Sequence, residues 1–330
     1  MKPQPQEQIR KKPLPLEFPG IHYIDEQELE AVTRVIRSRS LFRYYGVDLQ
    51  KEAESFEAEF AAFLGVKHAV AAGSGTGALS VALSALGVGP GQEIIVPAYL
   101  WVSVAAAVVN QGAIPVLADI DDTFGLDPAY VERRITKHTA GIIMTHMSGA
   151  PGDVAAVQSV ARAKGLFLLE DCAQCAGGSV HGRKVGTFGD MAIFSFQMNK
   201  NITAGEGGCV VTGDDRLFAR AFACHDLGYA RDDNGRLIFD DPDLRLWGRG
   251  TRLDELRAAV SGSNCASCRP SRPPCAPASI ASGRLWLASR RFNSGAWRTR
   301  RAIRARSSSQ PTPIMKRRGA STGRSGPKGS

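Results

Sequence analysis

The chain has 330 residues, of which 43% are hydrophobic and 22% are charged, and its formal net charge is +9. This length suits a large core or two domains, and this composition excludes a chain that is disordered or collagen-like throughout. The charge suggests binding to nucleic acid or to an acidic membrane, but it is unevenly distributed. Fifteen of the 41 basic residues and none of the 32 acidic residues lie in residues 261–330, so residues 1–260 have a net charge of −6. The composition predicts a mildly acidic globular body and a basic tail.

The seven cysteines and the start of the chain favour a cytoplasmic protein. An odd number of cysteines, without an apolar secretory signal near the N-terminus, indicates reduced thiols. Residues 1–17 are rich in proline and glutamine and predict a flexible N-terminal arm. The most apolar stretch, residues 100–109, is too short to cross a membrane. We therefore expect no membrane partner.

The body alternates expected helices and strands. Two amphipathic helices come first, and Asp25 and Glu28 form a capping-box pattern at the start of the first. The expected helices are 25–39, 51–64, 75–86, 102–111, 128–135, 154–164, 214–225 and one that starts near 252. The expected strands are 68–72, 93–97, 114–118, 140–146, 166–170, 191–196 and 208–212. Continuous apolar strands separated by helices predict an α/β fold with a largely parallel sheet covered on both faces. Catalytic groups should lie at the carboxyl ends of its strands.

A lysine follows one of the apolar strands, in the segment SFQMNKNITAGEGG that starts at Ser195. A lysine is most often a solvated surface group. Here Lys200 comes just after a buried strand and before glycines, which allow another group to approach the backbone closely. A partly desolvated lysine has a lowered pKa and can attack a carbonyl as an amine, forming a Schiff base.

Asp171 ends another apolar strand, in the segment EDCAQ. It is either a functional carboxylate at the sheet edge or a helix N-cap. Cys172 and Cys175 also form a C-x-x-C pattern, but their surroundings do not resemble a thioredoxin-type site, so we expect neither redox nor zinc chemistry. We predict no metal site.

A third segment, from Gly73 to Leu79, joins a strand to a helix and is rich in small residues. Free N–H groups at a helix N-terminus bind phosphate well when small residues let it approach. Its spacing matches neither the dinucleotide-binding pattern nor a P-loop. A Schiff-base lysine, a carboxylate and a phosphate cradle together are what pyridoxal 5′-phosphate requires, because the carboxylate keeps its ring nitrogen protonated.

Five motifs carry a family resemblance over residues 18 to 260: SGTGAL, VPAYLW, EDCAQ, GRKVGTFGD and SFQMNKNITAGEGG. With these, the chain resembles the DegT/DnrJ/EryC1/StrS family of sugar aminotransferases, which are fold type I pyridoxal-phosphate enzymes. The resemblance implies a large domain with a mostly parallel seven-stranded sheet, over residues 18–260. It also implies a small C-terminal domain, which this sequence does not contain in recognisable form.

The resemblance assigns roles to residues of this chain. Lys200 would be the catalytic lysine that binds the cofactor and moves the proton. Asp171 would pair with the pyridine nitrogen, and Gln174 would lie near the phenolic oxygen. Trp101 would stack on the ring, although it could also be an ordinary core aromatic. The phosphate ligands implied are Gly75, Thr76 and Ser195.

The implied reaction is transfer of an amino group from glutamate or glutamine to a keto-sugar, often nucleotide-linked, or to a keto-cyclitol. Relatives with histidine in place of the catalytic lysine are dehydratases, so Lys200 favours transamination. The site would lie at the interface of a homodimer. His146 and His225 could face this site or be hydrogen-bonded core histidines.

Two departures from the family stand out. Where the family has G-x-N-x-R, with an asparagine that reaches the partner subunit's cofactor, this chain has Gly250 at the asparagine position. Arg249 could supply a phosphate ligand instead. The second departure is the tail, residues 261–330, in which no helical or strand period continues the helix that starts near residue 252.

We interpret this tail as the product of a shifted reading frame. A neighbouring frame can encode Leu-Arg-Val-Gln-Leu-Arg-Lys-Leu-Pro over residues 261–269, and position 265 becomes leucine whichever codons are used. That sequence restores the apolar period of the helix. Sequencing the gene around codon 260 tests this hypothesis. The alternative is a disordered basic tail, which could bind polyanions without specificity; the chain could also be an inactive homologue.

Overall fold

The structure is a computed structural model that describes residues 19–232 and 236–267. The predicted flexible arm over residues 1–17 lies outside these residues, as does the tail from residue 268 onward. Within the described ranges, no helix is long and apolar enough to cross a membrane.

The described chain begins with a short 3-10 helix and two α-helices. They are η1 (Pro19–Tyr23), α1 (Glu26–Ser38) and α2 (Glu52–Leu64). The predicted capping box is confirmed: Asp25 accepts a hydrogen bond from the N–H of Gln27, and its own N–H donates to Glu28 at 2.7 Å. These bonds satisfy N–H groups that the first turn of a helix leaves without intrahelical partners.

One seven-stranded sheet forms the centre of the described chain, in the order β1, β9, β8, β5, β4, β2, β3. The strands are β1 (His68–Ala72), β2 (Glu93–Pro97), β3 (Ile114–Ala118), β4 (Thr139–Thr145), β5 (Phe167–Asp171), β8 (Met191–Ser195) and β9 (Gly208–Thr212). β9 runs antiparallel to β1 and β8, and the remaining neighbours pair in parallel. The mostly parallel sheet predicted from the sequence is confirmed.

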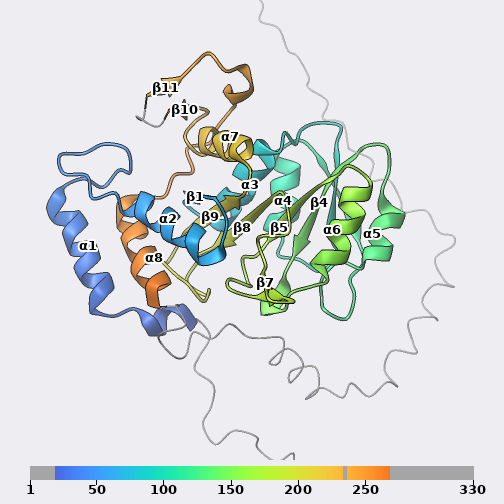
Figure 1. Cartoon of the computed structure of the whole chain (residues 1–330), viewed down its shortest axis with the longest axis horizontal. Coiled ribbons are helices and arrows are strands. Elements are labelled where there is room, and N and C mark those ends of the chain that lie inside the picture. Colours follow the sequence, from blue (N-terminus) through green and yellow to red (C-terminus); the bar gives the residue numbers. More distant parts are fainter. Residues whose placement is uncertain (1–18, 233–235, 268–330) are drawn as a thin grey trace, which may run out of the picture. The chain divides into compact units, whose positions relative to one another are not determined.

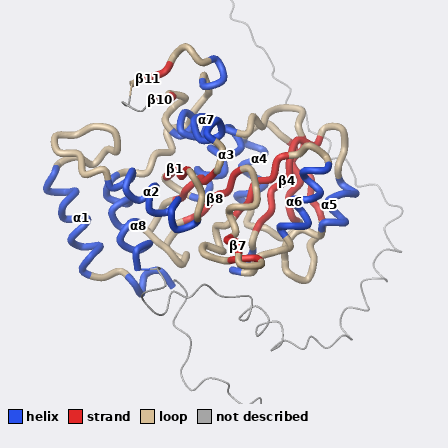
Figure 2. Tube along the Cα trace, viewed as in Figure 1, coloured by secondary structure: helices blue, strands red, loops and turns tan. Residues whose placement is uncertain are grey.

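Helices cover both faces of this sheet (Figures 1 and 2). Strand residues alternate between two buried cores: Ile95 belongs to one and Ile94 to the other. The first core includes residues of α2, α5 (Pro128–Arg134), α6 (Val154–Ala163) and α8 (Glu255–Ser267), and the second includes residues of α3 (Gly75–Ala85), α4 (Ser103–Asn110) and α7 (Asp215–His225). Burial on both faces explains why the inner strands are apolar throughout; β3, at the edge of the sheet, leaves Ile114 and Leu117 about half exposed.

The shorter elements lie in the connections and were not predicted. They are η2 (Met147–Gly149), β6 (Ser179–Val180), β7 (Arg183–Lys184), β10 (Ala230–Arg231), β11 (Leu237–Ile238) and η3 (Pro242–Leu244). Two-residue strands and single turns are too short to produce a hydrophobic period, so the sequence pattern carries no signal for them.

Helix α8 crosses the domain boundary that the sequence placed at residue 260. It packs beside α1 and α2 (Figure 1), and Glu255 near its start accepts hydrogen bonds from the N–H groups of Glu52 and Ala53 at the N-terminus of α2. Ser261, Asn264 and Cys265 are buried. The packing of these residues continues the helix although their apolar pattern has ended, and the domain boundary at residue 260 stays a prediction.

Candidate functional site

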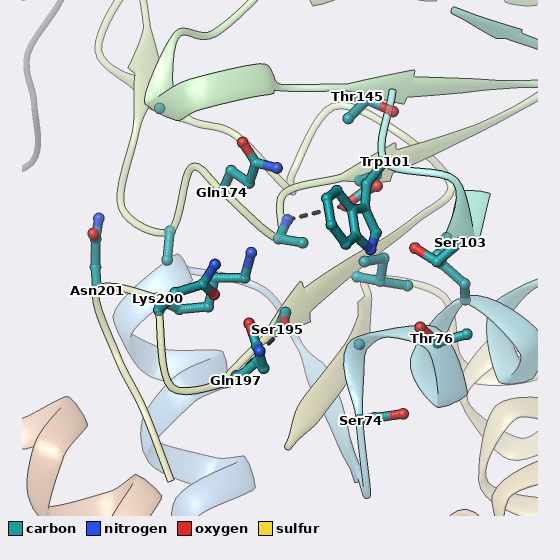
Figure 3. A pocket seen from close by; sticks show the side chains of 18 of the residues that line it. Ser74, Thr76, Trp101, Ser103, Thr145, Gln174, Ser195, Gln197, Lys200 and Asn201 are labelled. Carbon is teal, nitrogen blue, oxygen red and sulfur yellow. Dashed lines mark hydrogen bonds between the residues drawn. The ribbon is translucent and has the colours of Figure 1, made fainter. Parts of the chain in front are cut away.

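A cavity of about 560 Å³ opens at the carboxyl ends of the parallel strands (Figure 3). All seven residues predicted as catalytic or cofactor-binding line it: Gly75, Thr76, Trp101, Asp171, Gln174, Ser195 and Lys200. They come from strand ends and loops far apart in the sequence, and the parallel sheet brings them to one edge.

Asp171 is the last residue of β5, and its side chain is almost fully buried. Its Oδ1 accepts a hydrogen bond from the N–H of Ala173 at 3.0 Å, within a turn, so the helix N-cap interpretation is wrong. Burial raises the pKa of Asp171, opposed by that hydrogen bond and by the nearby His146 and Lys200. A cation in the cavity would further stabilise the ionised carboxylate.

Lys200 lies in the loop between β8 and β9 and is half-buried, so the solvated-surface interpretation is wrong. Burial lowers the pKa of its amine, while the charge of Asp171 acts in the opposite direction. Such an amine is neutral, and hence nucleophilic, over a wider pH range than an exposed lysine.

The phosphate cradle predicted from the sequence is the N-terminus of α3. Ser74 caps this helix: its Oγ accepts from the N–H of Gly77 at 3.0 Å. A Cβ on Gly75 would lie 2.8 Å from the Cβ of Ser195, so this position requires glycine. The first N–H groups of a helix have no intrahelical acceptors, and here they border the cavity.

Gln174 and Trp101 complete the predicted set. Gln174 accepts a hydrogen bond from the N–H of Ser148 at 2.9 Å through Oε1. The side chain of Trp101 is two-thirds exposed, at 66%, and reaches into the cavity from the loop before α4 (Figure 3). The alternative that Trp101 is a core aromatic is therefore wrong.

The two histidines that the sequence left open are both buried in the core. His146 Nδ1 accepts from the N–H of Gly152 at 3.4 Å, so Nε2 carries the proton and donates to Glu170 at 3.1 Å. His225 receives a hydrogen bond from Tyr44 Oη at 2.7 Å, and burial keeps its pKa well below the ordinary value. Neither histidine lines the cavity.

The C-x-x-C pair is also buried. Cys172 and Cys175 are free thiols, and burial raises the pKa of both, that of Cys175 to about 12. Redox and zinc chemistry both require thiolates, so this environment opposes the alternative that the pattern alone allows.

Arg249 donates to the backbone oxygen of Asn110 at 2.9 Å and does not line the cavity of the described chain. Gly250 has a φ of +60°, a left-handed conformation that glycine and asparagine adopt more readily than other residues. A contact from this segment to a partner subunit's cofactor stays a prediction.

Sequence reasoning missed several polar residues of the cavity. They include Ser74, Ser103, Thr145, Ser148, Gln197, Asn199, Asn201 and Glu206. Thr145 is notable because its buried Oγ1 has no hydrogen-bond partner among the described residues. It ends β4 directly beside Asp171 in the strand register. A search for polar residues at every strand's carboxyl end would have found it.

These groups fit pyridoxal 5′-phosphate. The N-terminus of α3, where Ser74, Gly75 and Thr76 line the cavity, suits a phosphate, and the buried Asp171 carboxylate suits a protonated ring nitrogen. The half-buried Lys200 amine suits the cofactor's carbonyl. The orphaned Thr145 hydroxyl offers one further polar contact to a ligand.

Comparison with proteins of known function and structure gives a consistent result. The chain is 47% identical over 215 residues to an L-glutamine:2-deoxy-scyllo-inosose aminotransferase of Micromonospora echinospora, covering 62% of this chain and 50% of that protein. It is 41% identical over 210 residues to a GDP-perosamine synthase of Caulobacter vibrioides, covering 62% and 54%. The crystal structure of 3-amino-5-hydroxybenzoic acid (AHBA) synthase superposes with a TM-score of 0.68 at 38% identity, covering 74% of this chain and 62% of that one.

In all these matches, the chain covers only part of the relative's length. The first curated relative, a scyllo-inosose-type aminotransferase of Streptoalloteichus tenebrarius, is 39% identical, and this chain spans 57% of its length. The sequence profile of the DegT/DnrJ/EryC1/StrS aminotransferase family matches residues 22–266, most of the described chain. The chain belongs to this family, with the fold type I architecture of its aminotransferases.

Proposed function

We propose that the protein is a pyridoxal-phosphate-dependent aminotransferase that moves an amino group from glutamine or glutamate to a keto-sugar or a keto-cyclitol. One observation carries this proposal: Asp171, at the end of β5, and Lys200, in the loop after β8, line the same cavity as the N-terminus of α3. Family membership and the names of the relatives support the substrate classes.

Each residue has a chemical task in this proposal. The bound cofactor supplies a carbonyl and an electron-withdrawing ring. Asp171 holds the proton on the ring nitrogen, and its burial makes that ion pair strong. Lys200 would hold the cofactor through its carbonyl carbon, and its amine would carry the proton that transamination moves.

The remaining residues orient the cofactor. The N-terminus of α3 and Ser195 would hold the phosphate, and Gly75 lets them lie close together, because a Cβ there would be 2.8 Å from the Cβ of Ser195. Trp101 would stack on the ring, and Gln174 would offer its amide N–H to the phenolic oxygen, because its Oε1 already accepts from the N–H of Ser148. Thr145, whose hydroxyl is buried, supplies a further hydrogen bond.

Trapping the lysine tests the cofactor role. The full chain is incubated with pyridoxal 5′-phosphate, reduced with borohydride and digested, and the modified lysine is identified by mass spectrometry. We expect the adduct on Lys200. Lys184 is a built-in control, because burial lowers its pKa too, yet it lines a different pocket. An adduct spread over surface lysines, with none enriched at Lys200, would refute the assignment.

Amino transfer is then measured from glutamine and from glutamate to a panel of nucleotide-linked keto-sugars and keto-cyclitols. We expect one donor and one acceptor class to react, and Lys200→Ala to abolish the reaction. Specific trapping at Lys200 without transfer to any acceptor would identify an inactive homologue, the alternative that the shortened match to the relatives raises.

We further propose that the protein acts as a homodimer. Support comes from large apolar side chains that are mostly exposed in the single chain, among them Tyr45, Val47, Val102 and Trp247, since large exposed apolar residues favour association. Sedimentation of the full chain should give twice the monomer mass. A monomer at micromolar concentration would contradict this assembly.

A further inference from the structure

The segment that carries Lys200 forms a closed loop over residues 196–207, between β8 and β9. Phe196 N donates to the backbone oxygen of Gly207 at 2.9 Å, and Met198 N donates to that of Gly205 at 3.0 Å. These hydrogen bonds act within the loop. The position of Lys200 in the cavity therefore also depends on the contacts that hold the loop from outside.

Two hydrogen bonds tie this loop to two distant segments of the chain, and a third joins those two segments to each other. The N–H of Gly20, in η1, donates to the backbone oxygen of Lys200 at 3.0 Å. Asn264, in α8, accepts from the N–H of Thr203 at 2.9 Å through Oδ1. Its Nδ2 donates to the backbone oxygen of Gly20 at 3.2 Å. We call this group of four residues the loop junction.

The junction is buried and tightly packed. Asn264 has no exposed surface and Thr203 is 1% exposed. Gly20 is so close to the loop that a Cβ on it would lie 2.6 Å from the backbone oxygen of Lys200. If the Asn264 side chain lost one of its two hydrogen bonds, the N–H of Thr203 or the backbone oxygen of Gly20 would lose that partner. An unpaired backbone group away from water destabilises the fold.

The chemistry of position 264 is demanding. Its side chain must accept from one backbone group and donate to another at the same time, and among uncharged side chains a carboxamide does this with separate atoms. By contrast, Gly262 lies on the same helix with open space around it.

We propose that Asn264 is a positioning residue for Lys200: by bridging Thr203 and Gly20, it fixes the loop so that the lysine amine faces the cavity. Asn264 does not line the cavity, so it acts through the backbone of the loop. The consequence for cofactor capture rests on the function proposed above, whereas the consequence for the loop itself does not.

The first test measures the loop directly, by hydrogen–deuterium exchange of the full chain without cofactor. Asn264→Leu removes both hydrogen bonds with little change in volume, and we expect exchange in residues 200–205 to accelerate by about tenfold or more. Gly262→Ala, on the same helix, should leave this exchange unchanged. Asn264→Gln keeps both groups and should restore at least part of the protection.

The second test measures Lys200 itself, by the rate of pyridoxal 5′-phosphate trapping with borohydride as a function of pH. A loosened loop exposes the amine, so for Asn264→Leu we expect at least about tenfold slower trapping at neutral pH and a midpoint shifted toward that of an ordinary exposed lysine. A role in stability alone would lower the melting temperature without moving this midpoint.

The outcomes separate the two proposals. Unchanged exchange and an unchanged midpoint in folded Asn264→Leu would overturn the positioning role. If the wild-type chain traps no cofactor at Lys200, the proposed function fails, and exchange in residues 200–205 still decides the role of Asn264. If Asn264→Leu does not fold, Asn264→Asp decides: it keeps the acceptor and loses the donor to Gly20, so it should accelerate exchange, and an unchanged rate would overturn the proposal.

Discussion

Replacing Glu170 by glutamine should destabilise the protein strongly, although the two side chains have nearly the same shape. Glu170 is fully buried behind the cavity, next to Asp171. Its Oε1 accepts from the N–H groups of Phe188 at 2.6 Å and Gly189 at 2.8 Å. Its Oε2 accepts from the N–H of Gly186 at 2.8 Å and from His146 Nε2 at 3.1 Å.

The magnitude follows from these four donors. Glutamine replaces one carboxylate oxygen by an NH2 group, which cannot accept, so two of the four donors lose their acceptor. A buried donor left without a partner costs about 1–3 kcal/mol. The free energy of unfolding of Glu170→Gln should therefore fall by about 2–6 kcal/mol. For a folded unit of this size, such a change should lower the melting temperature of Glu170→Gln by at least about 4 °C.

Differential scanning calorimetry of the full chain checks this value. Glu132→Gln is the matched control, because the Glu132 side chain is 60% exposed and its nearest cation, Lys164, is 3.7 Å away. An exposed ion pair contributes at most about 1 kcal/mol. If Glu170→Gln lowered the melting temperature no more than Glu132→Gln does, the reasoning about buried donors would be refuted.

Four further predictions follow from the site and from α8. Gly75→Ala should weaken binding of pyridoxal 5′-phosphate at least about tenfold in a fluorescence titration, because the new Cβ would lie 2.8 Å from Ser195; equal affinity would contradict the cradle. Burial lowers the pKa of Lys200 below the ordinary 10.5, and only the neutral amine reacts, so trapping should rise with pH through a midpoint below 10.5. Asp171→Asn should lower that midpoint further, since it removes the charge that raises this pKa; a shift upward would show the opposite coupling. Ser261→Ala should raise the free energy of unfolding by about 1 kcal/mol, because the buried Oγ of Ser261 has no partner among the described residues. Chemical denaturation measures this free energy, and a lower value than in the wild type would contradict the prediction.

The sequence predicted the strands well because each is a short apolar run that ends at a turn. The limits of β1, β2, β3 and β9 agree with the expected ranges to the residue. Its motifs also placed Lys200 and Asp171 at one sheet edge. The contacts of Asn264 could not be predicted, since they join residues 61 and 244 positions apart in the chain. Periodicity and motifs describe neighbours in sequence, whereas such contacts depend on how helices pack after the sheet has formed.

Helix α8 also sets a constraint on the order in which the molecule can assemble. It caps α2 through Glu255, a contact between residues 203 positions apart, and it ties Gly20 to the loop of Lys200 through Asn264. During synthesis, the sheet and the lysine are complete before α8 leaves the ribosome. Contacts between such distant residues form slowly, because the intervening chain must first be ordered. The lysine loop should thus reach its final rigidity in a late step of folding, after the strands beside it have paired.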